Sequence, residues 1–326
     1  MMRVPVQGTQ VPSSGDGRAA NAARDARGAL AVVTVLRRRG EPVIELRKVG
    51  AESFEEVYPL LAGFGGGLAK DVWRRMLFDY AWAHGPCRGY GLYEGNRVVG
   101  FLGTIFSRRR IQGREERMCN FSSWIVESEY RGASVMMMRP LVADLPGYTL
   151  VGYTPIPVTV AVFTRLGFQM LETEELILPP VPRPREVLRA LRGSFSASPE
   201  VLQRELSGEE RTIHNDLAYS RVRHVLLRRG NRHCYLVARR GRRKGLRVAE
   251  LLYIGDRAFF WENRILAQAA FTATMGAAAL SVDLRFAEGF DVPWAIRRPK
   301  PRIYRPAHPD LSPTAIDGLY SELLML

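Results

Sequence analysis

Separate stretches of the chain show alternating or helically spaced apolar positions, and these stretches predict its first elements. Residues 41–48 alternate enough to form a first strand. After a capping-box sequence at 53–56, apolar residues recur with helical spacing as far as Leu61, which predicts a helix. The glycine run 65–67 ends it, and we expect a second helix over 68–82.

From Gly89 onward the pattern changes to short strands separated by turn residues. Residues 91–103 predict a hairpin, because Gly95 and Asn96 supply the backbone conformations of a tight turn. The other elements expected before residue 179 are a strand at 118–126, a loop at 130–134, a helix at 135–145, a strand at 150–153, a helix at 158–166 ended by Gly167, and a strand at 168–178.

A proline-rich stretch at 179–184 is the clearest linker, because proline fixes φ and removes the backbone donor. The pattern after it partly repeats the order of the first half, so we expect a second lobe. The elements predicted there are a helix at 215–227, strands at 234–239 and 246–254, a helix at 262–275, a strand at 278–286, a proline-rich irregular stretch after 289, and a short helix at 312–324.

Composition permits a sizeable core and adds a strong positive charge. Apolar residues make up 46% of the 326 positions, which excludes wholesale disorder. Lysine and arginine number 47 against 33 acidic residues, for a net charge of +14. This surplus raises the possibility of a nucleic-acid partner. However, the sequence shows no helix-turn-helix spacing and no zinc-finger ligands, so we expect no specific nucleic-acid recognition.

Cysteine and histidine spacing gives no sign of a disulfide framework or a metal site. The three cysteines, Cys87, Cys119 and Cys234, are an odd and widely separated set. The histidines at 214, 224 and 233 are too far apart for a compact metal motif. We therefore expect no bound metal and a reducing, cytoplasmic location.

The hydropathy of the chain favours a protein without a membrane span. Its longest stretch of low charge, 267–282, is shorter than the ~20 apolar residues that a bilayer requires. The first 28 residues are rich in Gly, Ser, Pro, Ala and Arg, with no apolar core of a secretory signal. We interpret residues 1–40 as a mobile leader, although 29–36 could also form a short strand.

The stretch from Tyr90 to Leu171 resembles the GNAT (acyl-CoA N-acyltransferase) superfamily. The resemblance lies in a hairpin containing 98–103, a strand ending at Val126, the sequence Tyr-Arg-Gly at 130–132, and later Leu-Gly-Phe at 166–168. It implies an α/β fold (an α+β mixed sheet) in two tandem lobes, as in tandem bacterial members, with a degenerate second lobe. The predicted divisions are a leader at 1–40, a GNAT domain at 41–178, a linker at 179–190, and a second lobe with a C-terminal extension at 191–326.

The resemblance implies an N-acyltransferase that moves an acyl group, expected to be acetyl, from acetyl-CoA or another acyl-CoA to an amine by direct attack on the thioester. Backbone groups of Ile125 and Val126 would contact the pantetheine arm, and Val126 would polarise the thioester carbonyl. A helix N-terminus favours bound phosphate through its free N–H groups and dipole. The residues that would hold the pyrophosphate there are Arg131, Gly132, Ala133 and Ser134.

The sequence departs from the family pattern at the donor site. Ser134 and Met136 occupy two positions that are glycine in the family loop. Phe163 occupies the position where many members carry a tyrosine that protonates the departing thiolate. The carboxylates Glu127 and Glu129 follow the core strand and are candidates for the general base, with a solvated loop as the alternative.

Several readings of the function remain open at this point. Sugar amines, other small-molecule amines, amino acids and protein N-termini are all possible acceptors. The departures from the family pattern favour a second hypothesis, a weak or inactive scaffold that binds acyl-CoA or a partner. The basic charge supports a third, a nucleic-acid-binding protein. The oligomeric state is open as well.

Overall fold

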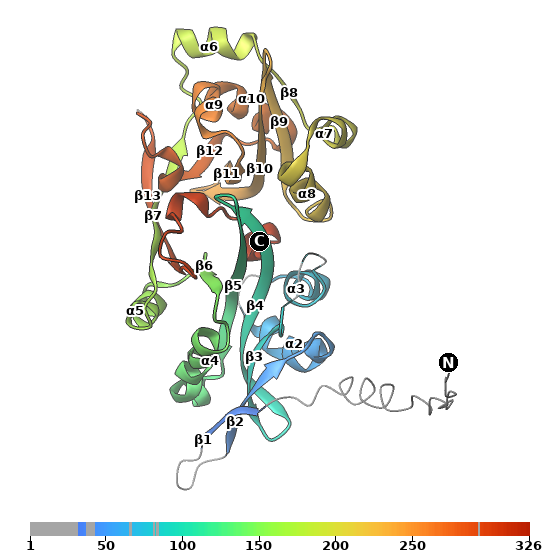
Figure 1. Cartoon of the computed structure of the whole chain (residues 1–326), viewed down its shortest axis with the longest axis vertical. Helices are drawn as coiled ribbons and strands as arrows, with labels where there is room; N and C mark the ends of the chain where they lie inside the picture. The colour runs from blue at the N-terminus through green and yellow to red at the C-terminus, as the bar shows by residue number, and fades with distance from the viewer. Residues whose placement is uncertain (1–31, 37–42, 65–66, 81, 83–84, 293) are drawn as a thin grey trace, which may run out of the picture.

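The structure is a computed structural model of the 326-residue chain, described over residues 32–36, 43–64, 67–80, 82, 85–292 and 294–326 (Figure 1). In this described part, thirteen strands form one continuous sheet in the order β1-β2-β3-β4-β5-β6-β13-β7-β12-β11-β10-β9-β8. The predicted α/β fold with a mixed sheet is therefore confirmed.

The first half of the chain supplies six strands at one end of the sheet and a seventh, β7, that lies beyond β13. They are β1 (Val32–Leu36), β2 (Ile44–Val49), β3 (Gly89–Glu94), β4 (Arg97–Ile111), β5 (Arg114–Val126), β6 (Tyr148–Gly152) and β7 (Gln169–Leu178). Its helices are η1 (Ala51–Ser53), α2 (Phe54–Gly63), α3 (Lys70–Leu77), the 3-10 helix η2 (Ser128–Met137), α4 (Met138–Ala143) and α5 (Pro157–Arg165).

The second half supplies five strands at the other end and a sixth, β13, that lies between β6 and β7. They are β8 (Ser194–Ser196), β9 (Arg223–Arg229), β10 (Arg232–Arg243), β11 (Leu246–Ile254), β12 (Ala279–Asp283) and β13 (Ile296–Arg305). Its helices are α6 (Pro184–Leu191), α7 (Pro199–Glu205), α8 (Gly208–Asp216), α9 (Arg257–Glu262), α10 (Arg264–Met275), η3 (Leu284–Ala287), η4 (Pro313–Ala315) and η5 (Glu322–Leu324).

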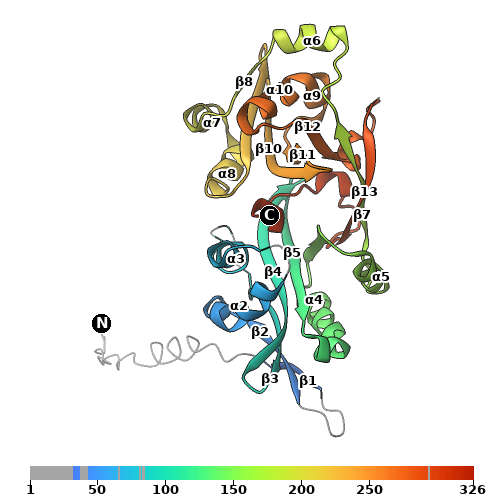
Figure 2. The same cartoon turned by 180° about the vertical axis from the view of Figure 1, so that it is seen from behind.

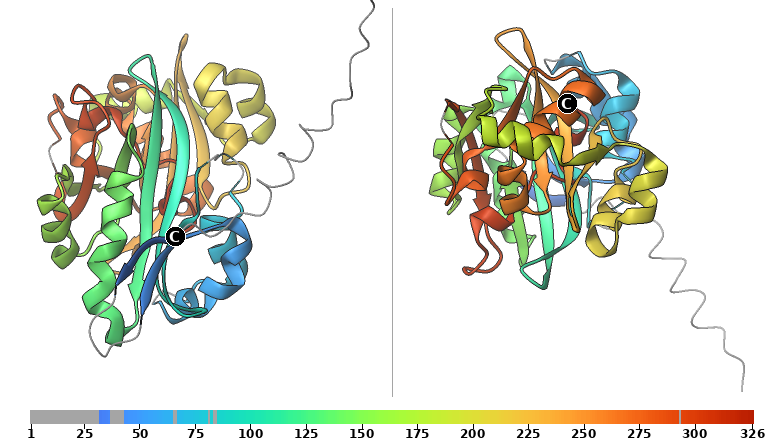
Figure 3. Two further views of the ribbon diagram at one scale, coloured as in Figure 1. Left: turned by 60° about the horizontal axis from the view of Figure 1, so that its bottom comes forward. Right: turned by 90° about the horizontal axis from the view of Figure 1, so that it is seen from above.

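Helices cover both faces of the sheet in each half. In the first half, α2 and α3 lie on one face and α4 and α5 on the other, as the opposite views in Figures 1 and 2 show. In the second half, α7 and α8 lie on one face and α9 and α10 on the other. Figure 3 shows the same layering from below and from above. Buried side chains between these layers form the hydrophobic core of each half.

The last strand of each half pairs with the sheet of the other half. β13 lies antiparallel to β6, with Tyr304 opposite Val151, and β7 lies antiparallel to β12, with Ser281 opposite Ile177. β13 and β7 also pair with each other along the middle of the sheet. The two halves are therefore joined by strand exchange, and backbone pairing crosses the predicted division at residue 178.

β13 corrects the prediction that the chain after Gly289 is irregular. Two prolines, Pro299 and Pro301, suggested that no strand could form there because proline lacks an N–H donor. The strand accommodates them with register shifts between Pro299 and Arg302 and at Ile303. Ion pairs made by its charged side chains hold this interrupted strand in place.

Two helices predicted from the sequence are also wrong. Residues 215–227 contain the end of α8 and most of β9, because the apolar run 225–227 pairs with β10 and is fully buried. Residues 312–324 form two 3-10 turns, not a helix, since their apolar side chains pack between the two halves. In both segments tertiary contacts override the local pattern.

The structure describes only part of the segments predicted as the N-terminal leader and the linker. Val32–Leu36 forms β1 antiparallel to β2, whereas the rest of the predicted leader at 1–40 lies outside the described residues. The predicted linker at 179–190 contains most of α6. The longest helix of the described chain, α10, has 12 residues, and no helix there could span a bilayer.

Candidate active site

β5 and β6 separate in the middle of the first half and leave a gap in the sheet. Their parallel pairing runs from Arg117 opposite Tyr148 to Asn120 opposite Val151 and ends there. A cavity of about 490 Å³ lies where they diverge. Its lining residues are Phe64, Leu68, Trp73, Met76, Leu102, Phe121, Ser122, Ser123, Trp124, Gly152, Thr154, Pro155, Ile156, Thr159, Phe163, Glu322 and Leu326. This volume is in the range of small-molecule sites.

A β-bulge in β5 opens the backbone at the wall of this cavity. The register with β4 shifts between Phe101 opposite Ile125 and Gly103 opposite Ser122. Ser123 has a φ of 56°, in the left-handed region that non-glycine residues rarely adopt. A bulge leaves an extra residue outside the ladder and re-aims its neighbours. The backbone at 123–124 is therefore turned out of the regular pairing beside the cavity.

Glu322 brings a buried carboxylate to the same cavity. Its side chain is 1% exposed, and one oxygen, Oε1, accepts a hydrogen bond from Thr154 Oγ1 at 3.0 Å. Its backbone N–H donates to Asn120 Oδ1 at 3.1 Å, while Asn120 Nδ2 donates to the Val151 carbonyl at 3.0 Å. The other carboxylate oxygen, Oε2, is buried without a hydrogen-bond partner.

The surroundings of Glu322 raise the affinity of its carboxylate for a proton. Burial raises the pKa of this carboxyl, while its hydrogen bonds with Thr154 and Asn120 and the charge of Arg302 lower it in part. A carboxylate with a raised pKa binds a proton more strongly than an exposed one. An unpartnered buried oxygen at a cavity wall can accept that proton from a bound ligand.

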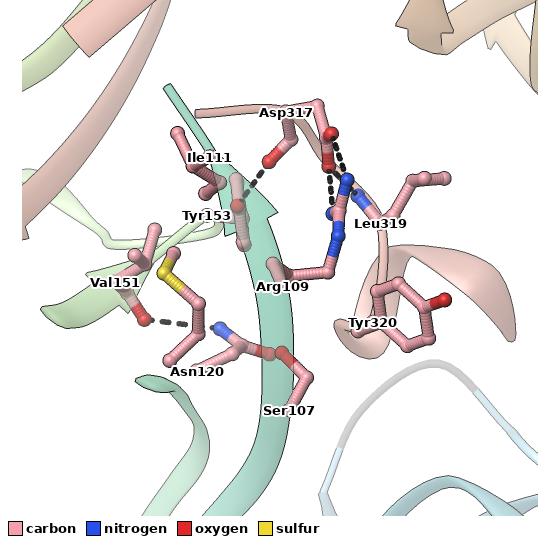
Figure 4. A pocket seen from close by; sticks show the side chains of 10 residues that line it. Ser107, Arg109, Ile111, Asn120, Val151, Tyr153, Asp317, Leu319 and Tyr320 are labelled. Atoms are coloured by element: carbon pink, nitrogen blue, oxygen red, sulfur yellow. Dashed lines mark hydrogen bonds and ion pairs between the residues drawn. The ribbon is translucent and has the colours of Figure 1, made fainter. Parts of the chain in front are cut away.

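The segment that carries Glu322 is fixed between the two halves of the molecule. Arg109 on β4 donates two hydrogen bonds to the Asp317 carboxylate, at 2.9 and 2.8 Å. The Tyr153 hydroxyl donates to the Asp317 carbonyl, and Figure 4 shows Asp317 between these two partners. The small cavity drawn there has a volume of about 10 Å³, no more than one water requires. These contacts hold the chain just ahead of Glu322.

Aromatic rings form one wall of the larger cavity. Phe163 is 2% exposed, and its ring stacks on Phe121 at 4.5 Å between centroids. Phe168 and Trp124 approach it edge-on at 4.9 and 5.9 Å. The indole Nε1 of Trp124 is buried and has no hydrogen-bond partner. The indole N–H of Trp124 is therefore an unpartnered donor in this wall, whereas the Phe163 ring has no donor.

Solved structures with a similar architecture include proteins described as N-acetyltransferases. A GCN5-related N-acetyltransferase from Kribbella flavida superposes with a TM-score of 0.54 and 15% identity, covering 81% of this chain and 72% of the other. The corresponding values for a GCN5-related N-acetyltransferase from Anabaena variabilis are 0.53, 12%, 81% and 73%. A fungal glucosamine N-acetyltransferase region, part of a multi-domain beta-N-acetylglucosaminidase, gives 0.52 and 12%, covering 81% of this chain and 38% of that one.

This chain has the GNAT fold. The coverage shows that the likeness extends over both halves and not only over the stretch that carries the sequence resemblance. No family model matches the sequence, and no curated protein matches it either. The fold is therefore recognisable in three dimensions at sequence identities too low to identify an activity.

Within the GNAT fold, the predicted base candidates lie away from the cavity. Glu127 accepts two hydrogen bonds from Arg97 Nη1, at 2.9 and 2.7 Å, and Glu129 is exposed in η2. Neither residue lines the cavity. Ile125 and Val126 are half-buried and directly follow the lining residue Trp124. The roles predicted for these four residues stay predictions.

The predicted phosphate loop is wound into a helix. Arg131, Gly132, Ala133 and Ser134 lie inside η2, where 3-10 geometry pairs each backbone N–H with the carbonyl three residues earlier. The Ser134 hydroxyl donates to the Arg131 carbonyl at 2.6 Å, and Arg131 itself is exposed. A pyrophosphate bound there would have to replace some of these bonds, so this site also stays a prediction.

Sequence reasoning missed Glu322 and the bulge. Glu322 lies about two hundred positions after β5, and the only local signal was a single acidic residue in the apolar run 319–326. His214 and His224 are too far apart in the sequence for a compact metal motif, but in the fold their ring centroids lie 5.0 Å apart. Among the described residues, no three His, Cys, Asp or Glu side chains are grouped as metal ligands.

Proposed function

We propose that the chain is an N-acyltransferase that moves an acyl group from an acyl-CoA to an amine in the cavity between β5 and β6. The observation that carries the proposal is Glu322, a buried carboxylate at the cavity wall with one unpartnered oxygen and a raised pKa. A neutral amine is the nucleophile in acyl transfer, so a base at the acceptor site is required.

In the proposed reaction, the carboxylate of Glu322 takes a proton from the acceptor ammonium. The amine nitrogen then attacks the thioester carbon and a C–N bond forms, after which the nitrogen loses its second proton to water and the C–S bond breaks. The CoA thiolate takes up a proton from water or from Glu322, because Phe163 has none to donate. A thiol is acidic enough to leave largely as thiolate, which makes a dedicated protein acid dispensable.

The oxyanion formed during attack needs hydrogen-bond donors. The backbone turned out of the ladder at Ser123–Trp124 and the free indole N–H of Trp124 lie beside the cavity and support this role. Val126, with Ile125, remains the proposed contact for the thioester and pantetheine arm. Arg131–Ser134 remain the proposed pyrophosphate contact, with acetyl-CoA as the expected donor.

The test compares two isosteric variants of acidic residues. Glu322→Gln keeps the bond from Thr154 but cannot accept a proton, so kcat with acetyl-CoA and an amine should fall by about 10²–10⁴-fold. Glu127→Gln should keep kcat within about threefold, because Glu127 is paired with Arg97 outside the cavity. Thiol release from acetyl-CoA gives the rates. A large loss in Glu127→Gln with full activity in Glu322→Gln would contradict the assignment.

A further inference from the structure

The wall of the cavity is predominantly apolar. Ten of its lining residues have large apolar side chains, and they are Phe64, Leu68, Trp73, Met76, Leu102, Phe121, Trp124, Ile156, Phe163 and Leu326. Burying a ligand surface of the same character against them is favourable, whereas burying an unpaired polar group is costly. The lining therefore selects for an apolar ligand body.

The cavity contains almost no charge in a strongly basic chain. Glu322 is the sole ionisable side chain among the described residues that line it, while the whole chain carries a net charge of +14. A ligand ammonium next to Glu322 has a countercharge, and the aromatic faces nearby also attract cations. A ligand carboxylate or phosphate would find no cation there and would be repelled by Glu322.

The hydroxyl groups of the wall are already engaged in hydrogen bonds. Thr159 donates to the Ile156 carbonyl at 2.8 Å, and Thr154 donates to Glu322. The Ser122 and Ser123 hydroxyls bond to each other at 3.3 Å. A ligand with many hydroxyls, such as a sugar, would lose more bonds to water than these few remaining donors and acceptors could replace.

The two faces of the sheet separate the donor side of the gap from the acceptor side. The predicted phosphate loop in η2 precedes α4, which lies with α5 on one face (Figures 1 and 2). The cavity residues Trp73 and Met76 belong to α3 on the opposite face. If the donor reaches the gap from the η2 side, then the wall around α3, with Phe64 and Leu68, receives the acceptor.

We propose that the acceptor is a primary amine on an apolar body, aromatic or alkyl, with no anionic group and few hydroxyls. The proposal rests on the proposed function and names the substrate class of that same site. The ammonium lies next to Glu322 and the apolar body packs against the α3 wall. Amino acids and sugar amines are disfavoured for the two separate reasons of charge and hydrogen bonding.

Binding alone provides the first test. Calorimetric titrations of the full chain would use 2-phenylethylamine, L-phenylalanine and glucosamine, which share a primary amine but differ by a carboxylate or by hydroxyls. We expect 2-phenylethylamine to bind at least about tenfold more tightly than either of the others. Equal affinities, or preference for the amino acid or the sugar, would overturn the proposal whether or not any acyl transfer occurs.

A charge introduced into the wall sharpens this test. Phe64 is 41% exposed, so Phe64→Arg can be made without disrupting the core, and it supplies a cation for a ligand carboxylate. It should reduce the preference for 2-phenylethylamine over L-phenylalanine by at least about fivefold. Leu246→Arg, at a 60% exposed position on β11 outside the cavity, is the matched control and should leave the preference unchanged.

Rates with acetyl-CoA and the same amines separate the two proposals. Selective binding of the apolar amine without any acyl transfer would contradict the proposed function and keep the assignment of the ligand class. Acyl transfer to glucosamine or L-phenylalanine with kcat/KM equal to that of 2-phenylethylamine would keep the function and overturn the class.

Discussion

Each half of the molecule contains a parallel strand pair that runs together and then separates, yet the two gaps differ. In the first half, β5 and β6 pair over four positions, ending at Asn120 opposite Val151. In the second half, β11 and β12 pair over three positions, ending at Glu250 opposite Ser281. The first gap holds the large cavity with Glu322 at its wall.

The second gap is occupied by the chain itself. Beyond Glu250, the Leu252 carbonyl accepts a hydrogen bond at 2.9 Å from the Gly318 N–H of the C-terminal segment, which we define as residues 311–326. The apolar side chains of this segment pack on Leu252 and its neighbours. Only four residues later the same segment places Glu322 in the first gap. The C-terminal segment therefore fills the second gap and contributes Glu322 to the cavity in the first gap.

The second half is also tied to the first by a buried ionic cluster. Glu250 lies at its centre, fully buried, with Lys300 at 2.5 Å, Arg239 at 2.9 Å and Arg302 at 3.2 Å. The link to the first half is Glu175 of β7, whose carboxylate lies 3.2 Å from Lys300 Nζ. Burial alone would raise the pKa of Glu250, but these cations hold it well below its usual range. The comparison indicates that the second half contributes structure and Glu322, whereas the first half has room for substrate.

Removing the centre of the ionic cluster should have the largest effect on stability. Glu250→Ala leaves several buried cations without their partner, which typically costs about 3–5 kcal/mol. Urea unfolding of the variant would measure the loss. Glu288→Ala changes an exposed glutamate of the same half and should alter the free energy of unfolding by less than about 0.5 kcal/mol. Equal stability of both variants would show that the cluster does not hold the halves together.

Releasing the C-terminal segment should affect both gaps at once. Asp317→Ala removes one of the two carboxylate partners of buried Arg109 and leaves Glu209. We expect a loss of about 2–3 kcal/mol in stability and a lower kcat, because Glu322 loses its fixed position. Asp310→Ala breaks an exposed pair with Arg114 and should cost less than about 1 kcal/mol. Asp317 is not among the described residues that line the larger cavity. Unchanged kcat in Asp317→Ala would therefore show that the C-terminal segment does not need to be fixed for the site to work.

The raised pKa of Glu322 predicts an acid limb in the rate profile. kcat/KM should fall about tenfold per pH unit below this pKa, and Glu322→Gln should lack that limb. Because the folded-state pKa is raised, protonated Glu322 adds stability at low pH that is lost as pH rises through the folded pKa. Glutamine mimics the protonated form, so the variant should gain in melting temperature over the wild type as pH rises. A difference in melting temperature that stays constant across pH would contradict the raised pKa of Glu322.

A hydroxyl at the aromatic wall should have the smallest effect. Phe163 lines the cavity where many GNAT proteins carry a tyrosine, so Phe163→Tyr could supply a proton to the departing thiolate. We expect kcat to rise by less than about tenfold, since a thiolate leaves well without help. Phe168→Tyr, in the same aromatic cluster but outside the cavity lining, is the control and should give no increase.

The strands and helices of the first half could be predicted because local pattern and tertiary environment agree there. The hairpin at Gly95 and the glycine stop at Gly167 follow from turn chemistry, and both glycines have positive φ in the structure. β13 could not be predicted in the same way. Its prolines lack donors, and its place in the sheet depends on side-chain contacts with Glu250 and Asp283, which lie far away in the sequence.

The candidate site shows the same limit. The motifs around β5 led to the predicted thioester contacts Ile125 and Val126, which directly follow the lining residue Trp124, because neighbouring elements of the GNAT fold are close in sequence. Glu322 could not be assigned, since nothing in a sequence states that residue 322 meets Asn120. The glutamates next to the motif, Glu127 and Glu129, were favoured by proximity along the chain, which is a poor guide where distant segments complete a cavity.

The most direct test of the account is the binding of acetyl-CoA to two tryptophan variants of α5. Thr159 lines the cavity, whereas the preceding residue, Val158, is 72% exposed and does not. Thr159→Trp should fill the gap between β5 and β6 and weaken acetyl-CoA binding by at least about tenfold in a calorimetric titration, while Val158→Trp should bind like the wild type. Equal affinity in all three proteins would show that the acyl donor does not enter the gap.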